Sequence, residues 1–156
     1  MAYLLDTNVL IAAKNDHYGF DFCPALWSWL DESNGAGVVR SVERVFDELI
    51  ELSEWARARR PFFLPLSAED VRAVAEINRW SNDSPDYDPA AKAELAGAAD
   101  SFLVAQAKAG NHTIVTHERI SDGRKRIKIR NAAAAHGVEW CTPFHMLRVE
   151  RARFVP

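Results

Sequence analysis

The chain has 156 residues, of which 48% are hydrophobic and 26% charged, and its formal net charge is −3. This length fits a single domain with a substantial core, which we expect to span residues 1–156. The sequence contains no run of about eighteen apolar residues, which argues against a membrane span. Asp6 and Asn8 interrupt the first apolar stretch and no basic leader precedes it, so we expect a cytoplasmic protein without a signal peptide.

Two compositional features refine this expectation. Cys23 and Cys141 lie far apart and neither belongs to a CxxC pair, which predicts two buried, reduced thiols. From Arg119 onward the chain holds nine of its 19 basic residues but only three of its 22 acidic residues. Such a basic segment is either a solvated surface or a flank that binds phosphate groups.

In the first half of the chain, strands and helices are expected to alternate. Residues 3–5 are apolar and end on Asp6, which is typical of a buried strand. Turn residues at 34–37 and caps at Thr7 or Asn8 and at Ser41 delimit the elements that follow. These are a helix over 9–14, a helix from Pro24 to about 32, a strand at 38–41, a helix over 42–56 and an extended connector at 62–66.

The second half repeats the alternation. Ser67 and Asp70 form a capping box, which predicts that a helix begins there and runs to about residue 80. Two prolines and three aspartates mark a loop at 81–89. The remaining elements are a helix over 92–109 with a break near Gly97, a strand at 112–116, an edge strand at 127–129, a short alanine-rich helix, a strand at 138–141 and a helix from Pro143. We therefore expect an α/β fold with three α/β/α layers around a mostly parallel sheet of four to five strands.

Acidic side chains fall where such a fold places functional groups. Asp6 follows the first strand and Glu118 follows the strand at 112–116, so both belong at the carboxyl edge of the sheet. Asp6 could instead cap the next helix, although Thr7 or Asn8 would serve equally well. Asp100 shares a helix face with apolar residues, where an unpaired carboxylate is costly unless a cation or the helix dipole stabilises it. In the helix over 42–56, periodicity favours Glu48 modestly over the other acids.

Four segments in order, LLDTNVLI, VFDEL, ADSFLVAQAKA and IVTHE, resemble the PIN-domain nucleases. The segment AAKNDHYGFDFCPALWSWL is similar to a subgroup known as DUF4411, which itself resembles the VapC-type toxins of type II toxin–antitoxin modules. This resemblance implies a metal-dependent endoribonuclease, with an RNA substrate, a cognate antitoxin protein and a homodimer as expected partners. It also implies a cofactor of Mg²⁺ or Mn²⁺, leaving one or two ions open.

The resemblance also assigns roles to residues. Asp6, Glu48 and Asp100 match the first three acids of the family, which selects Glu48 within its helix. The fourth position usually reads Thr-x-Asp before a Phe-containing turn, whereas this chain has Thr116-His117-Glu118 before a basic loop. Glu118 is therefore the expected fourth catalytic and metal-binding acid, with Asp122 as the alternative. Thr7, Asn8 and Thr116 would orient these carboxylates.

Other residue types complete the functional hypothesis. None of the histidines has a metal-ligand spacing, although His117 lies beside Glu118. The aromatic residues between Tyr18 and Trp29 are expected in the core or a dimer interface rather than stacked on bases. The basic residues expected to bind the RNA backbone are Arg119, Arg124, Lys125, Arg126, Lys128 and Arg130.

Three alternative functions fit the sequence less well. A haloacid-dehalogenase-type phosphatase would need an acid where Asn8 stands. A FEN-like DNA nuclease would use the same metal chemistry, but the chain has no helix-hairpin-helix module. A catalytically silent PIN-fold binding protein would have no reason to retain all four acids. We therefore expect an endoribonuclease, with the DNA nuclease and the binding protein as alternatives.

Overall fold

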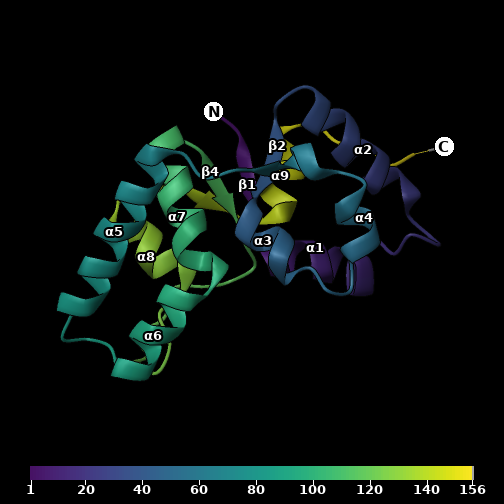
Figure 1. Ribbon diagram of the computed structural model, residues 1–156. Helices are drawn as coiled ribbons and strands as arrows, with labels where there is room; N and C mark the ends of the chain where they lie inside the picture. The colour runs from purple at the N-terminus through teal and green to yellow at the C-terminus, as the bar shows by residue number, and fades with distance from the viewer. Residues whose placement is uncertain (156) are drawn as a thin grey trace.

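The computed structural model describes residues 1–155, so only Pro156 of the expected domain lies outside the described residues. Its centre is a five-stranded, all-parallel sheet with the strand order β3-β2-β1-β4-β5 (Figure 1). The strands are short, and they are β1 Tyr3–Leu5, β2 Val39–Val42, β3 Phe63–Leu64, β4 Thr113–Val115 and β5 Trp140–Cys141.

Helices cover both faces of the sheet, which confirms the predicted three-layer α/β/α fold. In Figure 1, α5, α6, α7 and α8 lie together on one side of the strands, and α1, α2, α4 and α9 lie on the other. Their bounds are α1 Thr7–Ala12, α2 Pro24–Gly35, α3 Glu43–Glu48, α4 Ser53–Arg57, α5 Ala68–Asp83, α6 Pro89–Gly97, α7 Ala99–Gly110, α8 Ile129–Ala135 and α9 Pro143–Val149, with a π-helical turn at Ala13–His17 and a 3₁₀ turn at Arg60–Phe62.

The core lies against the three interior strands, β2, β1 and β4. Leu4, Val39 and Ile114 are fully buried on neighbouring strands, which fits the apolar runs that predicted them. From β1 the chain continues outward to β2 on one side, while β4 pairs with β1 on the other side. This reversal of strand order opens a crevice beyond the carboxyl ends of β1 and β4, where ligands bind in open α/β sheets.

Several element boundaries differ from the prediction. The helix expected over 42–56 is two helices, because the backbone leaves the helical region at Leu49 (ψ 65°) and α4 begins only at Ser53. Leu49 and Leu52 lie between α3 and α4 and are both buried. The apolar residues that predicted one helix therefore pack into the core although the helix is not continuous. A stripe of this kind reports which residues are buried, but it does not require that every intervening residue be helical.

Two predicted helix caps, at Thr7 or Asn8 and at Ser41, are also wrong. Asp6 occupies the N-cap position of α1, and Thr7 is already the first helical residue. Ser41 caps nothing, because it lies within β2 and its hydroxyl donates a 2.6 Å hydrogen bond to the Leu5 carbonyl. Only the capping box of Ser67 and Asp70 forms as predicted.

Two extended segments were assigned incorrectly. The connector expected at 62–66 contains β3, which pairs with β2 at the edge of the sheet. The edge strand expected at 127–129 does not form, and Ile129 instead begins α8. Both Ile127 and Ile129 are buried, so their alternation with Lys128 reflects burial without strand pairing. The predicted break near Gly97 is confirmed, since Ala98 separates α6 from α7.

The remaining structural expectations are mostly confirmed. Cys23 and Cys141 are free, but both are partly exposed rather than buried. Trp27 lies in the core, as predicted for the aromatic segment, whereas Phe20 and Phe22 are exposed. No helix within residues 1–155 is long and apolar enough to cross a membrane.

Candidate active site

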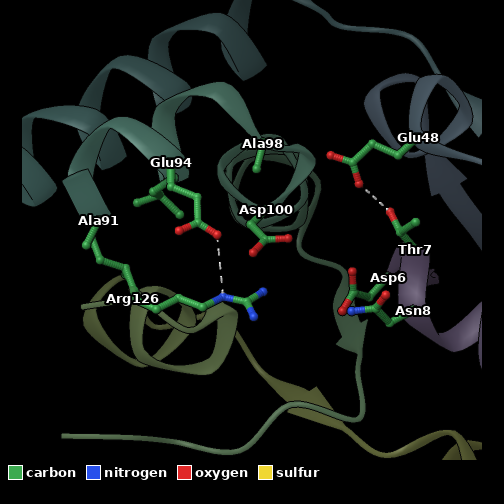
Figure 2. Close-up of a pocket in the computed structure, with 11 residues that line it drawn as sticks. Asp6, Thr7, Asn8, Glu48, Ala91, Glu94, Ala98, Asp100 and Arg126 are labelled. Atoms are coloured by element: carbon green, nitrogen blue, oxygen red, sulfur yellow. Dashed lines mark hydrogen bonds and ion pairs between the residues drawn. The ribbon is translucent and has the colours of Figure 1, made fainter. Parts of the chain in front are cut away.

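A pocket of about 170 Å³ lies beyond the carboxyl end of β1, between α3, α6 and the start of α7. Figure 2 shows its acidic side chains turned toward one another from these separate elements. Three of the four acids predicted for the site line this pocket. The complete lining consists of Asp6, Thr7, Asn8, Glu48, Ala91, Glu94, Leu95, Ala98, Asp100, Arg126 and Ile127.

Asp6 is the most deeply buried acid of the site, with 3% of its surface exposed. It stands at the N-cap of α1, yet its side chain makes no capping hydrogen bond there. One oxygen, Oδ2, instead accepts a 3.0 Å hydrogen bond from the Thr116 hydroxyl. The pKa of Asp6 is raised to about 6, mainly by burial and also by the charges of Glu118 and Glu48, against the lowering effect of Thr116 and of the Thr7 backbone.

Asp100 contributes the second desolvated carboxylate, from the first turn of α7. Its pKa is raised to about 7, mainly by burial and also by the negative charges of Asp6, Glu118 and Glu48, while Arg126 opposes the increase. These mutual effects show that the acids lie within electrostatic range of one another. Ionising both buried carboxyl groups at once costs free energy because their negative charges repel each other. A divalent cation bound between them would offset this repulsion.

Glu48 lies at the exposed rim, at the last residue of α3. Both of its carboxylate oxygens accept hydrogen bonds, from the Thr7 hydroxyl at 2.8 Å and from the Ala99 backbone N–H at 2.9 Å. Glu48 therefore joins the start of α1 to the start of α7, the helices that carry Thr7 and Asp100. Glu48 is the last residue of α3, and the backbone leaves the helical conformation at Leu49. The Glu48 side chain therefore lies at the end of the helix, where it reaches both α1 and α7.

Glu118 follows β4 but is not part of the pocket lining. Its Oε1 accepts a 2.8 Å hydrogen bond from Arg126 Nη2, and its Oε2 accepts a 2.9 Å hydrogen bond from the Ile129 N–H at the start of α8. Its own N–H donates to the Thr116 hydroxyl, which in turn donates to Asp6. Glu118 is thus connected to the site through Thr116 and Arg126.

The predicted basic residues have different environments. Arg126 lines the pocket, whereas Arg124 donates to the Pro85 carbonyl, and Arg130 donates to the Thr116 carbonyl and lies over the Trp140 ring. Arg119 and Lys125 are exposed, and Lys128 is partly buried at the N-cap of α8. The segment therefore brings one of its cations into the pocket.

Sequence reasoning missed Glu94. It lies on α6 and lines the pocket, with Oε1 3.8 Å from Nε of Arg126. The sequence did not indicate a functional role for Glu94, because an exposed acid on an alanine-rich helix is usually a solvated surface residue. Asp122, the alternative fourth acid, is exposed and does not line the pocket. His117 also points elsewhere, since its ring packs against His17 and Phe144.

The donor set fits a hard divalent cation in its chemistry. Asp6 and Asp100 offer carboxylate oxygens, and both residues line the pocket. Within residues 1–155, no three His, Cys, Asp or Glu side chains are grouped tightly enough to hold one ion together. Mg²⁺ commonly takes one or two carboxylates and fills its other positions with water and phosphate oxygens, so the pair of aspartates suffices.

Comparison with known proteins identifies one relationship. A family model described as "Domain of unknown function (DUF4411)" matches residues 3–154, which confirms that part of the predicted resemblance. No curated protein and no solved structure matches the chain. The match includes all four predicted acids, together with Glu94 and Arg126.

Proposed function

The chain belongs to the DUF4411 family, and we propose that it is a metal-dependent endoribonuclease that hydrolyses RNA phosphodiester bonds. The observation that carries this proposal is the pair of desolvated carboxylates, Asp6 and Asp100, whose pKa values are raised to about 6 and about 7. Perturbed acids in a polar pocket at the switch point of a parallel sheet are the usual mark of a functional site.

Asp6 and Asp100 would hold Mg²⁺ or Mn²⁺, and Glu48 and Glu118 complete the acidic set. When bound, such an ion activates water and stabilises negative charge on a phosphodiester. Without the ion, burial favours the protonated forms of Asp6 and Asp100, so both carboxyl groups would ionise at a higher pH than ordinary aspartates. This predicts that protons compete increasingly with the metal as the pH falls through the two raised pKa values.

The chain's own residues prepare this arrangement. Thr116 fixes the orientation of the Asp6 carboxylate through its 3.0 Å hydrogen bond. Glu48 holds the first turns of α1 and α7 in a fixed relation, so that Asp6 and Asp100 face the same space. The basic residues between Arg119 and Arg130 would bind the phosphates on either side of the cleaved bond.

The choice of RNA and of a PIN-type nuclease extends the sequence resemblance. The ordered segments around the four acids support it, and the three-layer α/β/α fold is compatible with it. The same resemblance to VapC-type toxins supports a further proposal, that the chain is the toxin of a type II toxin–antitoxin module with a cognate antitoxin and a homodimeric form. A FEN-like DNA nuclease and a catalytically silent binding protein are the competing functions.

The direct test is cleavage of single-stranded RNA and DNA by purified protein with Mg²⁺ or Mn²⁺. We expect RNA cleavage by the wild type, and a loss of about a hundredfold or more in Asp6→Asn, which keeps the side-chain shape but removes its charge. Asp83→Asn, an exposed change on α5, serves as the matched control. Cleavage of DNA alone would favour the FEN-like alternative, and neither cleavage nor metal binding would refute the enzyme.

A further inference from the structure

One cation lies among the acids of the pocket. Within the described residues, Arg126 is the only Lys or Arg in the pocket lining, where it accompanies Asp6, Glu48, Glu94 and Asp100. Figure 2 shows its guanidinium reaching from the edge of the pocket toward the two aspartates. The neighbouring Ile127 is 3% exposed and also lines the pocket. The buried Ile127 therefore anchors the backbone at the point from which Arg126 extends.

Glu118 fixes the position of this cation. Its Oε1 accepts from Arg126 Nη2 at 2.8 Å, and its Oε2 accepts from the Ile129 N–H at 2.9 Å. The Glu118 side chain is 11% exposed, whereas that of Arg126 is 45% exposed. The carboxylate is thus held by the first turn of α8, and it holds the guanidinium in turn. A carboxylate with both oxygens engaged in this way is poorly placed to ligate a metal ion.

Most of the guanidinium remains available to a ligand. A guanidinium carries five N–H donors, and within residues 1–155 Arg126 uses one hydrogen bond, the one to Glu118. Glu94 lies 3.8 Å from Nε, which is an ion pair beyond hydrogen-bond distance. The free donors suit the oxygens of a phosphodiester, which an arginine can bind with two parallel hydrogen bonds.

The charge balance of the pocket favours the same ligand. Four acids line it against one base, so a nucleic-acid phosphate entering next to Asp6 and Asp100 would be repelled. Arg126 lies in the same lining, and its positive charge would offset this repulsion. We propose that Arg126 binds the phosphodiester backbone at this site and that Glu118 is the positioning residue that holds it there, rather than a metal ligand. This inference rests on the proposed function.

A double-mutant cycle with Glu118→Gln, Arg126→Gln and the double variant tests it. Glutamine at 118 retains an oxygen that can accept from Ile129, so the start of α8 is preserved. Binding of Mn²⁺ alone is measured by calorimetry. Binding of a short single-stranded RNA in Ca²⁺ is measured by fluorescence anisotropy at several salt concentrations. Exposed positions on α5 provide the matched controls Glu69→Gln and Arg72→Gln.

We expect Arg126→Gln to weaken RNA binding about tenfold. The slope of the logarithm of the binding constant against the logarithm of the salt concentration should become shallower by about one, which corresponds to the loss of about one phosphate contact. Glu118→Gln should weaken RNA binding similarly, and the double variant should be no worse than either single variant. Arg126→Lys should restore the salt dependence without the full affinity. Glu118→Gln should leave Mn²⁺ affinity within about twofold of the wild type, whereas Asp100→Asn should reduce it about tenfold or more.

Loss of Mn²⁺ binding in Glu118→Gln equal to that in Asp100→Asn would make Glu118 a ligand and overturn the inference. Additive losses of RNA affinity in the double variant, or unchanged RNA binding in Arg126→Gln, would also overturn it. In each case a wild type that binds Mn²⁺ and cleaves RNA would leave the proposed function intact. A wild type that binds neither Mn²⁺ nor RNA would refute both.

Discussion

The Thr116 hydroxyl donates a 3.0 Å hydrogen bond to Oδ2 of Asp6, although the two residues are 110 positions apart in the chain. Asp6 follows β1 and Thr116 follows β4, and these two neighbouring strands pair in parallel, so the pairing itself brings the residues together. Thr116 is fully buried, and its oxygen also accepts from the Glu118 N–H. The hydroxyl is therefore oriented toward Asp6 by the backbone that follows β4.

Replacing Thr116 with valine should weaken Mn²⁺ binding by about tenfold to a hundredfold, because the Asp6 carboxylate loses the bond that orients it. The pKa of Asp6 should rise further, since this hydrogen bond lowers it in the wild type. Calorimetric titration with Mn²⁺ at several pH values measures both effects. Thr113→Val removes a buried hydroxyl from β4, the strand that Thr116 follows, and is the control. Equal Mn²⁺ affinity in both variants would contradict this role of Thr116.

Asp100→Asn should stabilise the metal-free protein at high pH. The pKa of Asp100 rises from 3.8 to about 7 on folding, so the folded chain binds more protons than the unfolded chain between these values. Stability due to Asp100 therefore falls as pH rises through this window. The variant should gain about 2 kcal/mol in unfolding free energy at pH 8, and nothing near pH 4.

Urea unfolding in EDTA, measured from pH 4 to pH 8, gives this difference directly. The partly buried histidines titrate in both proteins and cancel in the comparison. Asp83→Asn, an exposed substitution on α5, is the control. A stabilisation that is constant from pH 4 to pH 8 would mean that the Asp100 pKa is not raised.

Glutamine and alanine at position 48 should have different effects. Glu48→Ala leaves the buried Ala99 N–H without its acceptor and should lower the free energy of unfolding by about 1–2 kcal/mol. Glu48→Gln keeps an acceptor oxygen there and should unfold like the wild type. If the Glu48 charge also serves the metal, the glutamine variant should lose at least about tenfold in RNA cleavage while remaining stable. Full activity in Glu48→Gln would limit Glu48 to a structural role.

Expression in bacteria tests the toxin proposal. Induction of the wild type should arrest growth, and Asp6→Asn should relieve the arrest at equal protein levels. A gene adjacent to this one should encode a protein whose coexpression restores growth. Normal growth with verified expression of active wild type would refute the toxin role while leaving the nuclease itself untouched.

The order of strands and helices was predictable because the strands of a parallel sheet are buried on both faces and therefore appear in the sequence as apolar runs. Each central strand is a short apolar run, and the turn and cap residues around Ser67 and Gly97 mark real boundaries. The helix over 42–56 was wrong in its middle, since Leu49 and Leu52 stay buried whether or not the backbone is helical. The strand predicted at 127–129 was wrong for the same reason. Ile127 lies in a loop and Ile129 begins α8, and both are buried although neither is in a strand.

The candidate site was predictable to the extent that strand ends and helix faces determine it. Asp6, Glu48 and Asp100 line one pocket, as the resemblance implied. The hydrogen-bond partners of Glu118 were not predictable, since they depend on how the loop between β4 and α8 folds back. The same applies to Glu94, whose place in the pocket lining depends on how α6 packs after the extended backbone at Ala98 separates it from α7.

The central place of β1 has a consequence for synthesis on the ribosome. Tyr3 pairs with Val39 on one side but with Thr113 on the other, so the first strand emerges long before one of its two partners. A nascent chain can pair β1 with β2 early, yet it must keep the other edge of β1 uncovered until β4 is translated. Asp6 and Asp100 acquire their final surroundings only at that point. Truncated products that stop before β4 should therefore lack the acidic pocket altogether, and its chemistry should appear abruptly, with the last quarter of the chain.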